Sequence, residues 1–153
     1  MTIGEKTDGT NAYIIIEGDE IVGVQSRKRL ITPEDDNYGF AAWAKEYKDE
    51  LVTMGDGYHY GEWAGHGIQK NHLQLNRKHL FLFNTFRWNE NNPNRPECCD
   101  VVPVLYQGML KPETIPDLLE ELKSKDTKRE GVIVYYHDFR KYTKHTIKSP
   151  NGK

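Results

Sequence analysis

The sequence is poor in cysteine and has no long apolar run. Its only two cysteines, Cys98 and Cys99, are direct neighbours. A disulfide between adjacent residues is geometrically poor, and no second Cys or His pair stands at the spacing of a zinc finger. No stretch approaches the roughly 20 apolar residues that a membrane helix needs, and no basic segment followed by an apolar run opens the chain. We therefore expect a protein of a reducing compartment, the cytoplasm, with no membrane partner.

A large excess of one charge is also missing, because the formal net charge is −2. The charges are unevenly distributed, however. Nine Lys and Arg stand against three Asp and Glu between Lys123 and Lys153, so this stretch is +6 and the rest of the chain is −8. A solvated basic tail and a surface for polyphosphate or nucleic-acid backbone both explain this asymmetry.

The chain has the composition of a folded globular protein. Its 153 residues are 37% hydrophobic and 11% aromatic, with interspersed charges, which suits one domain with a real core. Gly18-Asp19 between two β-rich runs predicts a hairpin. Runs of β-favouring residues between turn signals predict strands at Asn11–Glu17, Glu20–Gln25, Tyr58–Ala64, Leu80–Trp88, Val101–Tyr106, Gly131–His137 and Tyr142–Lys148.

Two helices are predicted between these strands. Thr32-Pro33-Glu34-Asp35 has the pattern of a helix start, and apolar residues at helical spacing predict a helix from about Tyr38 to Thr53, ended by Gly55. Thr114 is predicted to cap a shorter second helix. The residues expected to face the core are Phe40, Trp43, Ala44, Tyr47 and Leu51 in the first helix and Ile115, Leu118, Leu119 and Leu122 in the second. This order of elements indicates an α+β domain, mainly antiparallel, over residues 1–153.

One segment near the start of the chain pairs a lysine with an acidic glycine turn and leads directly into an apolar strand. It reads Glu5-Lys6-Thr7-Asp8-Gly9-Thr10-Asn11. A lysine at the edge of a sheet, among other cations, can become a nucleophile near neutral pH. A surface Asp-Gly turn that opens a hairpin also explains the pattern. Lys-x-Asp-Gly resembles the first motif of the covalent nucleotidyltransferases, which comprise the ATP-dependent DNA and RNA ligases and the mRNA capping enzymes.

Further segments resemble this superfamily's motifs in the superfamily's order. Ser26-Arg27 resembles the Ser-Arg motif, and Tyr60-Gly61-Glu62-Trp63 followed by Gly67-Ile68-Gln69 resembles the third motif of the RNA ligases. Leu80-Phe81-Leu82-Phe83-Asn84 resembles the motif whose aromatic residue stacks on the purine, and Glu130-Gly131 followed by apolar residues resembles the fourth motif. The stretch from Gln25 to Trp43 is also similar to a phage and bacterial branch of the RNA ligases.

The resemblance implies a role for each matching residue. Lys6 would be the nucleophile, with nucleotide-binding positions beside it at Glu5, Asp8, Gly9 and Asn11. Arg27 would contact nucleotide phosphates, Glu62 a ribose hydroxyl and Phe83 the adenine. Phe81 shares a face with Phe83 by strand alternation, so spacing alone does not choose between them. We prefer Phe83 because the polar Asn84 follows it. The Glu130 carboxylate would engage the catalytic metal.

The fifth motif departs from the family pattern of two lysines separated by one residue. The chain has Lys144-His145-Thr146-Ile147-Lys148, so one lysine of the pair is missing in either register. We favour Lys144 as the phosphate contact, with Thr146 as an uncharged substitute and Lys148 in reserve.

The activity implied by the resemblance is ATP-dependent joining of polynucleotide ends through a covalent lysyl-AMP. Its cofactors would be ATP and Mg²⁺ or Mn²⁺, and its substrate a nucleic acid with 5′-phosphate and 3′-hydroxyl ends, RNA rather than DNA, in a bacterial or phage-infected cytoplasm. Few residues flank the outermost motifs, so we expect a minimal or trimmed core with no C-terminal accessory domain. The alternatives are a nucleotide-binding module that has lost its chemistry and a GTP-dependent capping-type enzyme.

Overall fold

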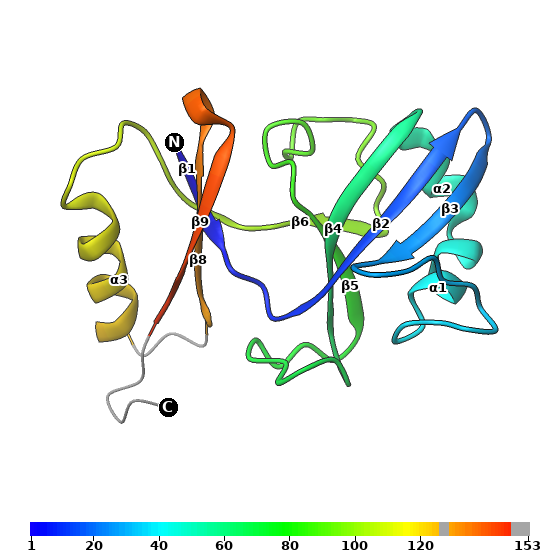
Figure 1. Ribbon diagram of the computed structural model, residues 1–153, viewed down its shortest axis with the longest axis horizontal. Helices are drawn as coiled ribbons and strands as arrows, with labels where there is room; N and C mark the ends of the chain where they lie inside the picture. The colour runs from blue at the N-terminus through cyan, green and yellow to red at the C-terminus, as the bar shows by residue number, and fades with distance from the viewer. Residues whose placement is uncertain (126–128, 148–153) are drawn as a thin grey trace. The chain divides into compact units, whose positions relative to one another are not determined.

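The computed structural model describes residues 1–125 and 129–147 (Figure 1). The chain divides into two compact units. The smaller unit combines residues 1–7 with residues 102–153, and the larger unit comprises residues 8–101. No helix in the described ranges is long and apolar enough to cross a membrane. Each unit is built around its own sheet and has its own apolar core.

The larger unit contains a five-stranded sheet. Its strand order is β3-β2-β4-β5-β6, and every neighbouring pair is antiparallel except β5–β6. The bounds are β2 Gly9–Glu17, β3 Glu20–Ser26, β4 Gly57–Gly65, β5 Lys78–Leu82 and β6 Cys99–Val101. The hairpin predicted at Gly18-Asp19 joins β2 to β3, and Gly18 has the positive φ of 60° that such a turn favours. The mainly antiparallel α+β fold is thus confirmed.

One face of this sheet packs against the apolar core of the unit. Ala12, Ile14 and Ile16 alternate along β2 and point into the core, together with Trp63 of β4. Two short helices, α1 (Phe40–Glu46) and α2 (Lys48–Leu51), contribute Phe40, Ala44 and Leu51 to the same core. The predicted inward stripe is therefore confirmed, since Trp43 and Tyr47 also pack against this cluster.

The start of the first helix was wrongly predicted. The segment at Thr32 forms a turn in which the backbones of Thr32 and Asp35 bond to each other, and the helix begins only at Phe40. The Asp36 carboxylate accepts hydrogen bonds from free backbone N–H groups in the first turn of this helix. Its Oδ1 accepts the Ala41 N–H at 2.8 Å, and its Oδ2 accepts the Ala42 N–H at 3.0 Å. An acid placed before the first turn thus takes the role assigned to Thr32.

Three other predicted elements have different bounds. The single helix to Thr53 is broken at Tyr47, and after α2 a 3₁₀ turn over Val52–Met54 leads to Gly55. β5 stops at Leu82, because the chain turns where the Trp88 N–H bonds to the Asn84 carbonyl. The strand predicted at Val101–Tyr106 is two strands in different sheets, β6 and β7 (Val104–Gln107).

The smaller unit is a four-stranded sheet with one helix against it. The strand order is β7-β1-β8-β9, all antiparallel, with β1 Thr2–Glu5, β8 Gly131–Tyr136 and β9 Lys141–Thr146. β1 was not predicted as a strand. The last strand ends before the predicted Lys148, which lies outside the described residues.

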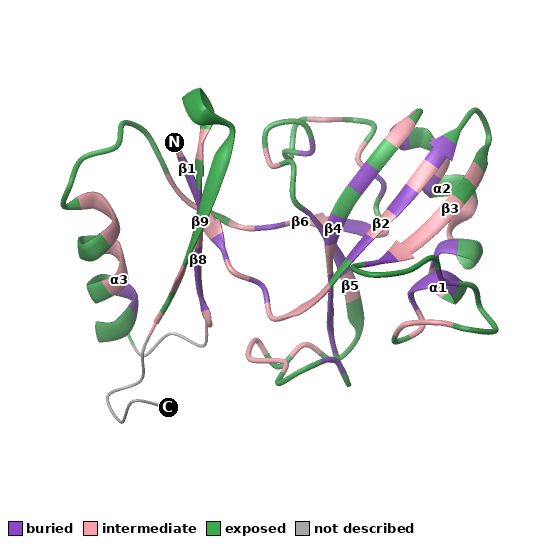
Figure 2. Cartoon of the chain, in the orientation of Figure 1, coloured by how far each residue is buried: buried purple, intermediate pink, exposed green. Residues whose placement is uncertain are grey.

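The helix α3 (Thr114–Ser124) covers one face of this sheet, as Figure 1 shows. Its Leu122 is buried with Ile3, Val132 and Val134, and the other predicted inward residues Ile115, Leu118 and Leu119 pack against them. Thr114 is the first helical residue rather than the cap, which is Glu113 without a side-chain hydrogen bond. No described helix or strand of this unit covers the opposite face of the sheet, and along β9 most side chains are exposed (Figure 2).

Candidate active site

Lys6 is held at the end of β1 by the two strands that flank it. The Lys6 N–H donates to the Gly131 carbonyl at 2.9 Å, and the Glu5 N–H donates to the Pro103 carbonyl at 2.9 Å. Lys6 therefore continues the pairing of β1 with β8 by one residue, next to Glu130 at the start of β8. Its position is fixed by backbone bonds from both sides.

The Lys6 and Glu130 side chains form an ion pair. Lys6 Nζ lies 2.7 Å from Glu130 Oε1, and the two side chains are 21% and 30% exposed. The structure thus brings together the predicted nucleophile and the predicted metal ligand, which are remote in the sequence. Their partial exposure leaves both groups accessible to a ligand.

A second ion pair supports this end of the sheet. Arg129 Nε donates to Glu5 Oε2 at 3.0 Å, and the Glu5 side chain is only 3% exposed. Glu5 is opposite Val132, on the core side of the sheet, whereas Lys6 follows on the other side. Glu5 therefore anchors the backbone at Lys6, while its predicted contact with the nucleotide stays a prediction. Arg129 was not recognised from the sequence, because nothing in the local pattern marks it as a partner for Glu5.

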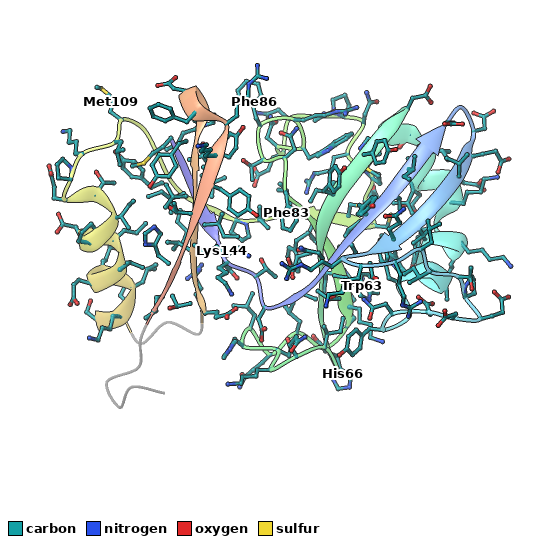
Figure 3. The ribbon with its side chains drawn as sticks, viewed as in Figure 1. Trp63, His66, Phe83, Phe86, Met109 and Lys144 are labelled. Carbon is teal, nitrogen blue, oxygen red and sulfur yellow. The ribbon has the colours of Figure 1, made fainter. Side chains whose placement is uncertain are left out.

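Two more predicted residues share the open face of the small sheet with Lys6. Lys144 is opposite Ile133 and Thr146 is opposite Gly131, so both lie on the face that α3 leaves uncovered. Figure 3 shows Lys144 projecting from β9 on the side of this sheet away from α3. A Cβ on Gly131 would come within 2.2 Å of the His145 carbonyl oxygen, so the close approach of β9 requires glycine here. Glycine also leaves the surface between Lys6 and Thr146 free of a side chain.

In the larger unit, Glu62 lies on the face of the sheet opposite the core. The register places Asn11 of β2 and Phe81 of β5 on either side of Glu62. The next residue, Trp63, is 1% exposed and points into the core, so Glu62 points the other way. A carboxylate, an amide and an aromatic ring thus stand in one row across three strands. Arg27 follows β3 directly and is exposed.

The two candidate stacking residues differ in exposure. Phe81 is 9% exposed and belongs to neither apolar core, whereas Phe83 is 37% exposed. The Phe83 N–H donates to the Tyr60 carbonyl at 3.0 Å, so Phe83 continues the register one residue past the end of β5. Phe81 is the neighbour of Glu62, and Phe83 offers the larger free ring surface.

Asp8 and Gly9 tie the start of β2 to the loop that follows β4. Asp8 Oδ2 accepts the Lys70 N–H at 3.1 Å and lies 3.6 Å from His72 Nε2. A Cβ on Gly9 would come within 2.3 Å of the Trp63 carbonyl oxygen, so glycine is required by the approach of β4. The Asp-Gly motif therefore has a structural task as well as its predicted contact with a nucleotide.

A polar pair beside Phe81 was missed by the sequence analysis. His79 Nδ1 and Asp100 Oδ2 are 2.7 Å apart, and the His79 ring centroid lies 5.6 Å from that of Phe81. The parallel pairing of β5 with β6 brings the two residues together. No sequence signal predicts this contact, because β6 is short and His79 and Asp100 are 21 positions apart in the chain.

Among the residues that the structure describes, no group of three His, Cys, Asp or Glu side chains is arranged to hold a metal ion. Both cysteines are free, and the pKa of the Cys99 thiol is raised by its hydrogen bond with Cys98 and by burial. The partly exposed Glu130 carboxylate is different. Mg²⁺ is commonly bound through one or two carboxylates while phosphate and water oxygens complete its shell, so a single accessible carboxylate fits such an ion.

A family model described as RNA ligase matches residues 1–149 of the chain. Two variants of the Naegleria gruberi RNA ligase, solved with ATP and Mn, are similar in structure. Their TM-scores are 0.70 and 0.67 at 20% and 19% identity, and each match covers 98% of this chain and 50% or 49% of the other. The structure of the same ligase with PPi matches with a TM-score of 0.66 at 21% identity, and the match covers 95% of this chain and 48% of that chain. The chain thus spans about half the length of these structures, and the likeness shows a shared fold.

Proposed function

Because the chain belongs to the RNA ligase family, we propose that it is the adenylation domain of an ATP-dependent polynucleotide ligase, with Lys6 as its nucleophile. The observation that carries the proposal is the 2.7 Å contact between Lys6 and Glu130 at the edge of an open sheet face. It places an amine beside an accessible carboxylate, with Lys144 on the same face. Attack of an amine on a polyphosphate needs positive charge near the phosphates, which Lys144 and a metal ion at Glu130 would supply.

The proposed reaction has a first step on this chain. The neutral Lys6 amine attacks the α-phosphorus of ATP, a P–N bond forms, and the P–O bond to pyrophosphate breaks. The amine proton passes to solvent. An ammonium group has no lone pair for this attack, so Lys6 must first leave its ion pair with Glu130. We infer that Glu130 holds Lys6 in place before ATP arrives and releases it when ATP binds.

The later steps join two polynucleotide ends. A 5′-phosphate oxygen of the nucleic acid attacks the AMP phosphorus, and the P–N bond to Lys6 breaks. A 3′-hydroxyl then attacks the activated 5′-phosphate, the new phosphodiester bond forms, and AMP leaves. RNA is the proposed substrate, in the cytoplasm of a bacterium or a phage-infected host.

Phosphate charge is the main obstacle to the first step, because negative oxygens repel a nucleophile. Lys144 is the proposed phosphate contact, with Thr146 donating a hydroxyl hydrogen bond next to it. Lys148 is the alternative to Lys144, and Arg27 is also proposed to contact nucleotide phosphate. When Mg²⁺ or Mn²⁺ is bound at Glu130, it supplies further positive charge to the phosphate oxygens.

The nucleoside is proposed to bind the open face of the larger sheet. Glu62 would accept a hydrogen bond from a ribose hydroxyl, with Asn11 beside it in the same row. The Phe83 ring would stack on adenine, and Phe81 would close the site next to Glu62. The tie from Asp8 to the Lys70 backbone would hold the loop after β4 against this site.

Intact mass spectrometry tests the proposal directly. Wild-type protein mixed with ATP and Mg²⁺ should gain one adenylate that survives denaturation, and Lys6→Ala should gain none. Lys48→Ala is a matched control, because Lys48 is also ion-paired, at 3.1 Å from Glu20 Oε1, but lies away from the proposed site. A wild-type protein that stays unmodified at every pH tested would refute the proposal.

Thr146 favours a second candidate function. It occupies the position of a lysine in the family's fifth motif, and loss of that charge suits a module that binds nucleotide without reacting. Such a module would bind ATP in equilibrium dialysis and give no adduct. Repeating the adduct assay with GTP tests the capping-type alternative, which predicts a guanylate adduct instead.

A further inference from the structure

The open face of the small sheet carries a pair of exposed tyrosines. Tyr135 of β8 is directly opposite Tyr142 of β9, and the two are 40% and 61% exposed. Nothing in the proposed adenylation step uses either ring. Two large exposed aromatic side chains opposite each other on one sheet face form a candidate binding surface.

The tyrosine pair lies in line with the candidate active site. On the open face, the row Gly131–Thr146 beside Lys6 is followed by the row Ile133–Lys144 and then by the row Tyr135–Tyr142. Each step of two residues along a strand covers about 6.6–6.8 Å, so the tyrosine row lies roughly 13–14 Å from Lys6 along the strands. A strand end that reaches the Lys6 adenylate would therefore pass over these rings.

The Tyr135 ring is held in place by its neighbours. The His137 ring packs edge-on against it, with centroids 5.1 Å apart and an interplanar angle of 89°. His137 Nε2 is in turn hydrogen-bonded to Thr2 Oγ1 at 2.8 Å, and Thr2 is opposite Tyr135 in the sheet. Such a fixed ring loses little conformational entropy when a planar group stacks on it.

A lysine and an arginine lie near the tyrosine pair. Lys144 Nζ lies 6.0 Å from the centroid of the Tyr142 ring, and Arg140 is exposed two residues before Tyr142. Lys144 lies on the open face with the tyrosines, whereas Lys141 is opposite Tyr136 and lies on the other face. This surface is therefore positive as well as aromatic.

A second tyrosine cluster has no such charge. Tyr13, Tyr58 and Tyr60 of the larger unit contact one another, and Tyr58 is 60% exposed. The turns next to Tyr58 carry the acids Glu17, Asp19, Glu20 and Asp56. Aromatic exposure alone is thus common to both clusters, and only the Tyr135–Tyr142 pair combines it with cations.

We propose that Tyr135 and Tyr142, together with Lys144 and Arg140, bind the 5′-phosphorylated end of a single-stranded polynucleotide. One or two bases stack on the tyrosines while the cations contact the backbone, which is how proteins hold single strands without reading their sequence. This inference rests on the proposed ligase function, because it concerns the strand that receives AMP from Lys6. It assigns the second substrate to the two tyrosines and Arg140, while Lys144 serves both this strand and the ATP phosphates.

Fluorescence anisotropy with a 3′-labelled, 5′-phosphorylated single strand, without ATP, measures this binding separately from adenylylation. Tyr142→Ala should weaken binding about tenfold, since stacking on one aromatic side chain contributes on that order. Tyr142→Phe should bind like wild type because it keeps the ring. Tyr58→Ala, which removes an equally exposed tyrosine from the acidic surroundings, is the matched control and should not change the affinity. The same measurement with an RNA strand and with a DNA strand shows which of the two polynucleotides binds more tightly.

Two further readouts separate this site from the nucleotide site. Arg140→Gln should reduce the slope of log affinity against log salt by about 0.7, the contribution of one phosphate contact on a single strand. Lys6 adenylylation by ATP should stay within about twofold of wild type in Tyr142→Ala. An unchanged strand affinity in Tyr142→Ala, an equal loss in Tyr58→Ala, or a parallel loss of adenylylation would each overturn the inference. Failure of wild type to form the adenylate would instead overturn the proposed function, whatever the strand affinity.

Discussion

The Lys6 ammonium and the Glu130 carboxylate form an ion pair of 2.7 Å at the point where β1 ends and β8 begins. Backbone pairing of the two strands creates this contact, since the Lys6 N–H donates to the carbonyl of Gly131, the residue after Glu130. The pair is partly exposed, so an incoming ligand can compete for either group. Glu130 is thereby suited both to position Lys6 and to bind a cation once Lys6 is released.

Glu130 and Glu62 should therefore respond differently to magnesium. Glu130→Ala should change the Mg²⁺ concentration at which adenylylation reaches half its maximum, because a metal ligand is lost. Glu62→Ala should weaken use of ATP by about 1–3 kcal/mol through a lost ribose hydrogen bond, with the Mg²⁺ curve unchanged. Mg²⁺ titrations of the adduct yield in both variants measure this. Identical curves would show that the two roles are wrongly divided.

Lys144 should control the ATP requirement. Lys144→Ala would remove the proposed charge-assisted bond to phosphate, so it should raise the ATP concentration needed and slow the step, at a cost of about 1.5–3 kcal/mol. Thr146→Lys restores the family's lysine pair on the same sheet face and should preserve or improve the reaction. Initial rates of adenylate formation against ATP concentration test both variants. If Lys148→Ala strongly slows adenylate formation and Lys144→Ala leaves it unchanged, the motif has been placed four residues too early.

Arg129 should stabilise the fold through its buried partner. Arg129→Met leaves the Glu5 carboxylate, 3% exposed, without its ion-pair partner, and should lower the free energy of unfolding by about 3 kcal/mol. Lys48→Met breaks the exposed pair with Glu20 and should cost less than about 1 kcal/mol. Urea unfolding of the two variants compares them. Equal small losses would mean that the Glu5–Arg129 pair does not stabilise this end of the sheet.

His59 should make the stability depend on pH. Burial lowers the pKa of His59 below its usual 6.5 in the folded protein, and Nε2 can donate to the Gly55 carbonyl at 2.8 Å in the neutral ring. As the pH falls below about 6.5, the unfolded chain takes up a proton that the folded chain refuses, so stability is lost.

Urea unfolding at a series of pH values between 8 and the onset of acid unfolding, on the order of pH 5, measures this loss. His59→Gln removes the titrating group and should flatten that part of the curve. A stability that rises as the pH falls through 6.5 would contradict the sign of the shift.

Patterns local in the sequence predicted the hairpin of β2 and β3 and the buried face of β2 correctly. Gly18-Asp19 marks the β2–β3 hairpin, and the alternation of Ala12, Ile14 and Ile16 marks the buried face of β2, because both signals depend on residues close in the chain. The same reasoning failed at Thr32, where a good capping pattern has no apolar face behind it and the helix starts only at Phe40. The helix begins where Phe40 can pack against Trp63, and this packing outweighs the local preference of the Thr32 segment to start a helix.

The candidate residues were found in the sequence, but their partners were not. Lys6, Glu62 and Glu130 stand in recognisable motifs, whereas Arg129 and the His79–Asp100 pair do not. Which carboxylate meets which cation depends on strand order and register, and these arise from contacts between distant segments. A one-residue change of register would turn Lys6 to the opposite face of the sheet.

By itself, the sequence determined the chemical groups of this protein and the faces on which alternation places them, since both follow from residue type and a period of two. The tertiary structure decided how these groups combine. It buried Glu5 against Arg129, paired Lys6 with Glu130, and aligned Lys144 and the two tyrosines on one open face. The physical reason is that β1 lies between two strands from the other end of the chain, β7 and β8, and only this long-range hydrogen bonding sets their register.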